Sequence, residues 1–113
     1  MEKVLIYNDV YQQNFILIIS DDIDAISKTY EVPFNGEGLT LARGTIIYIF
    51  LGTGSSISDL VHEAHHAISF MWEDRGIELI EGKDEPFAYA MGWIVKKIYP
   101  VWRRSKKFPV QGT

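Results

Sequence analysis

All three histidines of the chain lie in one pentapeptide, residues 62–66, which reads His-Glu-Ala-His-His. On a helix, His62 and His66 lie on the same face one turn apart, because they are four residues apart. Two imidazoles at this spacing can bind one cation, and the pattern H-E-x-x-H is typical of zinc sites on helices. Zinc lowers the pKa of a bound water to about 7, and Glu63 could then accept its proton. The pentapeptide predicts a zinc site with Glu63 as the general base.

A simpler interpretation is that the three histidines are solvent-exposed or packed side chains of an ordinary amphipathic helix. We favour the metal site, because the chain has no histidine outside these five residues.

Two histidines leave room for a third protein ligand. The glutamates available downstream are Glu78, Glu81 and Glu85. We favour Glu85, because it begins the next predicted helix and so has a position fixed by secondary structure. The small residues Ala88 and Gly92 lie on the helix face above it and would let this helix approach the histidine helix closely. The alternative role for Glu85 is that of a first-turn acid that favours the helix dipole.

The pattern His62-Glu63-x-x-His66, followed by Glu85 on a second helix, resembles the gluzincin metallopeptidases. The segments Leu-Val-His-Glu-Ala-His-His-Ala and Asp-Glu-Pro-Phe-Ala-Tyr-Ala-Met-Gly-Trp-Ile are similar to those of short zincin-like proteins encoded by phages and prophages. The resemblance covers about residues 39–99. It implies a minimal zinc metallopeptidase that keeps a small sheet, an active-site helix and a glutamate helix.

The resemblance also implies residue roles. His62, His66 and Glu85 would bind Zn²⁺, and Glu63 would be the catalytic base. A sheet edge beside the active-site helix would pair with an extended peptide. Residues 45–51 are the candidate substrate strand, which includes Tyr48 and Phe50. Position 89 is Tyr where thermolysin-like enzymes carry Asp. The side chains that could orient a ligand or stabilise an oxyanion are Asp59, Tyr48, Tyr89 and His65.

A second class of function stays open, a zinc-binding but non-catalytic interaction or structural domain of a phage-type protein. In that case the metal holds two helices together, and a fourth protein ligand closes the site. The expected partners are a peptide or protein substrate, a second copy of the chain or a phage protein.

The composition of the 113 residues is that of one small domain, with 47% apolar residues and no Cys. The absence of Cys excludes disulfides, thiolate metal sites and a Cys nucleophile. No apolar run approaches the ~20 residues of a membrane span, so we expect no membrane partner and a cytoplasmic protein, in the host cytoplasm if a phage encodes it.

The net charge of -4 divides unevenly along the chain. Residues 1–95 contain all 15 acidic residues and five basic ones, whereas residues 96–113 contain six basic residues and no acidic one. We interpret the basic segment as a solvated helix end and tail. Nucleic-acid binding through it is a weaker alternative.

The hydrophobic pattern predicts an α+β domain over residues 1–101 with a basic tail over 102–113. Strands are expected at residues 4–7, 15–20, 39–42 and 45–51, in a small mixed or antiparallel sheet. Helices are expected at residues 22–30, 56–74 and 84–99. Ser56 and Asp84 are the expected N-caps of the last two helices, and Pro100 is expected to stop or kink the final one.

Overall fold

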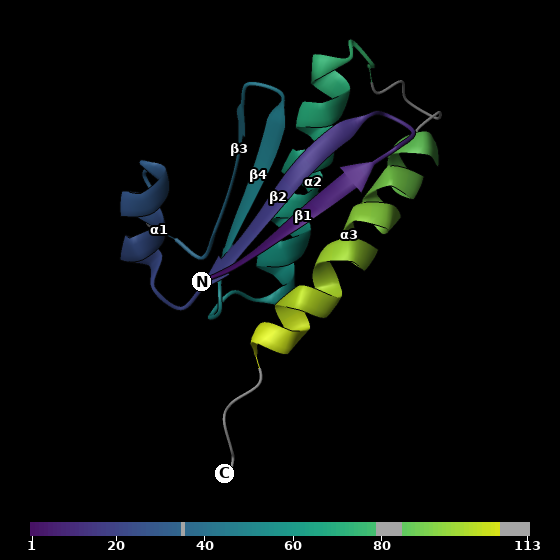
Figure 1. Cartoon of the computed structure of the whole chain (residues 1–113). Coiled ribbons are helices and arrows are strands. Elements are labelled where there is room, and N and C mark those ends of the chain that lie inside the picture. Colours follow the sequence, from purple (N-terminus) through teal and green to yellow (C-terminus); the bar gives the residue numbers. More distant parts are fainter. Residues whose placement is uncertain (35, 79–84, 107–113) are drawn as a thin grey trace.

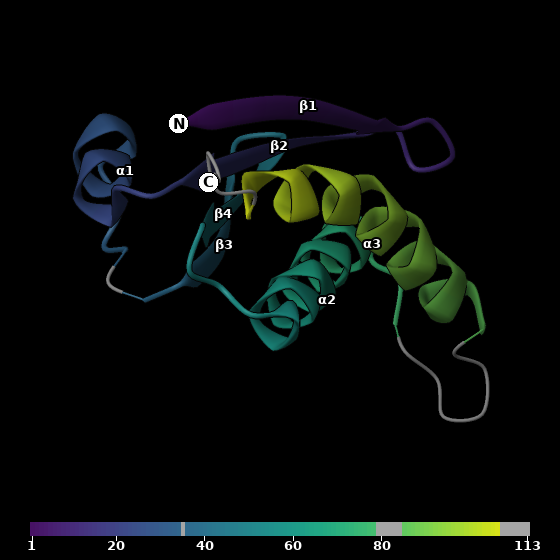
Figure 2. The ribbon, with the colours of Figure 1, turned by 90° about the horizontal axis from the view of Figure 1, so that it is seen from below.

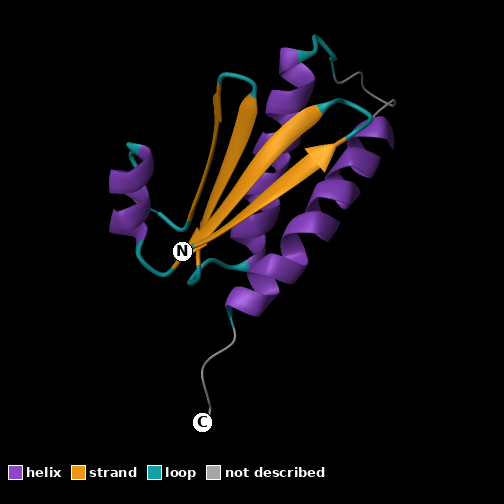
Figure 3. Ribbon diagram, in the orientation of Figure 1, coloured by secondary structure: helices purple, strands orange, loops and turns teal. Residues whose placement is uncertain are grey.

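The computed structural model describes residues 1–34, 36–78 and 85–106 (Figure 1). Its elements, in chain order, are β1 (Glu2–Asn8), β2 (Gln13–Ser20), α1 (Ile23–Tyr30), β3 (Gly38–Arg43), β4 (Ile46–Gly52), α2 (Ile57–Asp74) and α3 (Glu85–Ser105). The predicted α+β class is confirmed, with a four-stranded sheet and three helices (Figure 3).

The sheet is mixed, and its strand order is β1-β2-β4-β3. The outer pairs, β1 with β2 and β3 with β4, are antiparallel, whereas β2 and β4 are parallel. Between β2 and β4 the chain passes through α1 and then β3, which runs antiparallel to both. This returns the chain to the end of the sheet at which β2 begins, so β4 can run parallel to β2. The two free edges of the sheet are therefore β1 and β3.

The two central strands are buried on both faces, which explains their nearly continuous apolar sequences. Alternate residues of β2 and β4 pack against α2 and α3 in the larger core cluster. The residues between them, such as Ile16, Ile18 and Phe50, pack with Ile26 of α1 on the opposite face. Figure 2 shows α2 and α3 side by side beneath the sheet, with α1 well away from them.

Helix α2 begins and ends as its sequence predicts. The Ser56 side chain accepts a hydrogen bond from the backbone N–H of Asp59, and the Asp59 side chain accepts one from the backbone N–H of Ser56, which is a complete capping box. The chain leaves the helix through Gly76, whose φ of 67° is readily adopted only by glycine. The expected cap of the next helix, Asp84, lies outside the described residues.

Helix α3 corrects two expectations. It passes through Pro100 and continues to Ser105, so Pro100 does not stop it. The last turns are held by packing, because Val101 and Trp102 are buried and the Trp102 indole N–H donates to Ser55 Oγ at 2.9 Å. Residues 102–106 thus belong to the folded domain rather than to a tail. No helix in the described part of the chain is long and apolar enough to cross a membrane.

Candidate metal-binding site

The two outer histidines of the pentapeptide converge on the surface of α2. Their Nε2 atoms are 3.0 Å apart, and their rings meet nearly edge to face at 84°. Zinc–nitrogen distances of about 2.0–2.1 Å place two nitrogens about 3.3 Å apart in tetrahedral geometry. His62 is exposed and His66 is half-buried, so an ion can reach both nitrogens from solvent. The pair fits the first half of a metal site.

His62 and His66 lie on the outer face of α2, between its two flanks. On one flank, His65 and Trp72 contact Phe87 of α3, with ring centroids 5.2 and 5.1 Å apart. On the other flank, Glu63 contacts Thr40 of β3. At about 100° per residue, the mean direction of residues 62 and 66 is equally far from residue 63 and from residue 65, so the pair lies on the outer face between the β3 flank and the α3 flank.

Glu63 is buried between α2 and β3, with 7% of its surface exposed. Thr40 Oγ1 donates to Glu63 Oε1 at 2.7 Å, and the same hydroxyl lies 3.1 Å from the Glu63 main-chain oxygen. A Cβ on Gly38 would lie only 2.7 Å from Glu63 Cγ and 2.9 Å from Oε2. The carboxylate therefore depends on a glycine and a hydroxyl of β3 for its place directly after His62.

The free edge next to this site is β3. The backbone N–H of Gly52 donates to the carbonyl of Glu37 at 2.9 Å, so alternate residues from Glu37 onward bond β4. The residues between them, Gly38, Thr40 and Ala42, then direct their backbone groups to the free side. Two of these three residues, Gly38 and Thr40, also contact Glu63.

The assignment of residues 45–51 as the substrate strand is wrong. Strand β4 is hydrogen-bonded on both sides, to β2 and to β3, and has no free edge. Tyr48 and Phe50 lie on the sheet face opposite α2, where they stack on each other at 5.9 Å and contact Tyr30 of α1.

Glu85 does not join the histidine pair. Among the described residues, no three His, Cys, Asp or Glu side chains gather closely enough to hold a metal ion. Helix α3 turns Phe87, Ala90 and Ile94 inward, whereas Glu85, with Ala88 and Gly92, is exposed. The face expected to approach α2 is thus the solvent face, and a Cβ on Gly92 would meet no atom within 4 Å.

The remaining candidates also lie apart from the two converging nitrogens. Asp59 Oδ2 accepts from the Ser56 N–H at 2.8 Å in the capping box, and Tyr89 is 72% exposed on α3. His65 packs on Phe87. Glu78 is exposed beyond the end of α2, and Glu81 lies outside the described residues.

No protein-family model matches the sequence, and no significant match exists among curated proteins or solved structures. The resemblance to the gluzincin metallopeptidases is therefore corrected. It required Glu85 beside His62 and His66, and the described residues contain no such group of three. What stands is a pair of histidines with a buried glutamate beside them.

Sequence reasoning missed Thr40 and Gly38, the two β3 residues that hold Glu63. A threonine and a glycine in a predicted strand carry no signal of their own. Their role depends on how β3 packs against α2, which only the folded structure shows.

Proposed function

We propose that the chain is a zinc-dependent hydrolase of peptide bonds, in which His62 and His66 hold the metal and Glu63 is the general base. The observation that carries the proposal is the 3.0 Å separation of the two Nε2 atoms on an open helix face. Bound zinc would supply Lewis-acid activation of water and of the substrate carbonyl.

Glu63 is suited to move a proton because its two oxygens have different surroundings. Oε1 is held by the Thr40 hydroxyl, whereas Oε2 accepts no hydrogen bond from the described residues and faces the space that the missing Cβ of Gly38 leaves. Oε2 would take one proton from the attacking water and return it to the leaving amine. The water oxygen ends in the new carboxyl group as the C–N bond breaks.

The substrate would be an extended peptide on the free edge of β3. The outward backbone groups of Gly38, Thr40 and Ala42 can bond such a strand by β-augmentation. This position carries the peptide past Glu63, because Gly38 and Thr40 are the residues that contact its side chain.

A second candidate function is zinc binding without catalysis. The observation that favours it is the burial of Glu63, since a carboxylate with 7% exposure and a hydroxyl partner can serve to join α2 to β3. Both candidates share the histidine pair and differ only in the role of Glu63.

The test is hydrolysis of a mixture of quenched fluorescent peptides by the zinc-loaded chain and by the Glu63→Gln variant. We expect the wild type to cleave and the variant to retain zinc while losing cleavage by at least about 100-fold, the usual contribution of a general base. Cleavage that survives in Glu63→Gln contradicts the proposed mechanism. A wild type that binds zinc and cleaves no peptide favours the second candidate.

A further inference from the structure

A cavity of about 480 Å³ lies on the other side of the molecule's helical layer, where the turn between β1 and β2 meets the first turns of α3. It is separate from the histidine pair, because none of the described residues that line it belongs to α2. The residues that line it are Asn8, Asp9, Val10, Tyr11, Glu85, Pro86, Tyr89, Ala90 and Trp93.

The lining combines aromatic and apolar groups. Tyr11, Tyr89 and Trp93 contribute three aromatic side chains, and Val10 adds an aliphatic one. Val10 is 78% exposed and Tyr89 is 72% exposed, which are high values for such large side chains. A ligand that covered them would remove apolar surface from water.

The charge of this cavity is negative. Asp9 and Glu85 contribute carboxylates, and no Lys, Arg or His is among the described residues that line the cavity. The first turn of α3 carries a positive partial charge of roughly half a unit, which one carboxylate more than offsets. Aromatic faces attract cations through their quadrupoles, so the walls and the rim favour the same kind of ligand.

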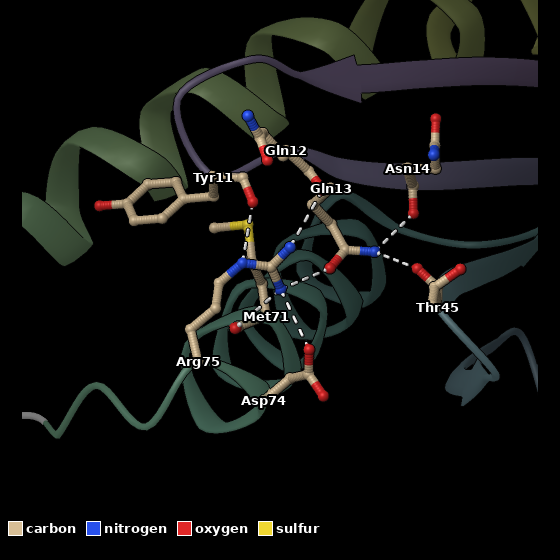
Figure 4. Close-up of polar contacts among 8 residues, drawn as sticks. All are labelled: Tyr11, Gln12, Gln13, Asn14, Thr45, Met71, Asp74 and Arg75. Carbon is tan, nitrogen blue, oxygen red and sulfur yellow. Dashed lines mark hydrogen bonds and ion pairs between the residues drawn. The ribbon is translucent and has the colours of Figure 1, made fainter.

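The turn that forms one wall is held in place by Arg75, the residue that follows α2. Arg75 donates to the carbonyl oxygens of Tyr11 at 2.8 Å and Gln12 at 3.1 Å, as Figure 4 shows. The side chain of Asn8 accepts a hydrogen bond from the Tyr11 N–H at 2.8 Å. Because these contacts fix the turn from within the protein, the wall is preformed before any ligand arrives.

We propose that this cavity binds a small organic cation, an alkylammonium group held against Tyr11, Tyr89 and Trp93 with Asp9 and Glu85 at the rim. Charge complementarity selects the occupant, because a neutral apolar ligand would leave the two carboxylates without a partner and an anion would be repelled by them. The proposal is independent of the metal site and of hydrolysis.

The experiment is an NMR titration of the full chain with three probes of similar shape: choline, its neutral isostere 3,3-dimethyl-1-butanol, and the anion 3,3-dimethylbutanoate. We expect amide shifts confined to residues 8–11 and 85–93, and choline binding about fivefold or more tighter than the neutral isostere. The anion is expected to bind more weakly than either. Absence of choline binding, equal binding of the neutral isostere, or shifts elsewhere in the molecule would overturn the proposal.

Matched variants locate the site. Tyr89→Ala and the double variant Asp9→Asn/Glu85→Gln are expected to weaken choline binding. Their side chains are exposed, so both variants are expected to keep the fold, which the amide spectrum checks directly. Tyr99→Ala, on the same helix, and Asp24→Asn, in α1, are the controls and are expected to leave binding unchanged. Equal binding by the wild type and both test variants would also overturn the proposal.

Discussion

Thr40 Oγ1 donates a 2.7 Å hydrogen bond to Glu63 Oε1, and this bond joins the edge strand β3 to helix α2. Both residues are buried, at 8% and 7% exposure. A carboxylate in such a place needs a partner, because an unsatisfied buried oxygen costs free energy. The bond therefore fixes the one acidic side chain that directly follows a histidine of the converging pair.

Removing the Thr40 hydroxyl is expected to destabilise the fold. Thr40→Val keeps the shape of the side chain but leaves Glu63 Oε1 without its donor, and the free energy of unfolding should fall by about 1–3 kcal/mol. Thr40→Ser, which keeps the hydroxyl, should lose less. Urea unfolding of the three proteins measures this, and equal stability of Thr40→Val and wild type would show that the bond contributes nothing.

A methyl group at position 38 is expected to displace Glu63. In Gly38→Ala the new Cβ would lie 2.7 Å from Glu63 Cγ, which is closer than atoms can approach, so strain of about 1–3 kcal/mol is expected. The matched control is Gly92→Ala on the exposed face of α3, where the new Cβ would meet no described atom within 4 Å beyond its own neighbours in the helix.

Gly92→Ala should instead stabilise the protein by about 0.5–1 kcal/mol, because alanine favours the helix. The two melting temperatures should therefore move in opposite directions. A rise in both would mean that Glu63 moves aside at no cost, and would contradict the close packing of β3 on α2.

Replacing Glu85 is expected to leave zinc binding intact. Glu85 is exposed on the solvent face of α3 and lines the aromatic cavity rather than the histidine pair. Isothermal titration of Glu85→Ala with zinc should give the affinity of the wild type. A large loss of affinity would restore Glu85 as a ligand and would contradict the packing of α3 described above.

Arg75 is expected to stabilise the protein through the turn it holds. Its guanidinium donates to the carbonyls of Tyr11 and Gln12 and to Gln13 Oε1 (Figure 4). Arg75→Ala should lower the free energy of unfolding by about 1–3 kcal/mol, since the Gln13 side chain is buried and loses its donor.

The control is Asp74→Ala, which removes only an ion pair whose carboxylate side is 79% exposed. An exposed pair contributes at most about 1 kcal/mol, so Asp74→Ala should unfold near the wild-type urea concentration. If both variants lose the same stability, the contacts of Arg75 with the turn are without effect.

Local sequence patterns predict the helices and strands, but they say little about how these elements pack against one another. The N-cap Ser56 is a local pattern, and it is found where expected. The sequence also indicates which face of α3 packs against the rest of the protein, because the buried apolar residues follow helical spacing: Phe87, Ile94, Ile98 and Val101. The small residues Ala88 and Gly92, which were expected to face α2, lie on the exposed face instead.

Strand order was harder to predict. The run Ile46–Gly52 is apolar at nearly every position, which favours a central strand over an edge. Its pairing with β2 depends on a crossover that no local pattern specifies. For the same reason the contact of Thr40 with Glu63, across 23 residues of sequence, could not be foreseen.

The most direct test of the central claim is zinc binding by the histidine pair, measured as bound metal per chain after equilibrium dialysis. We predict one zinc per wild-type chain, loss of that zinc in both His62→Ala and His66→Ala, and full retention in His65→Ala, whose ring packs on Phe87 instead. Absence of bound zinc in the wild type, or the same loss in all three variants, would contradict the account.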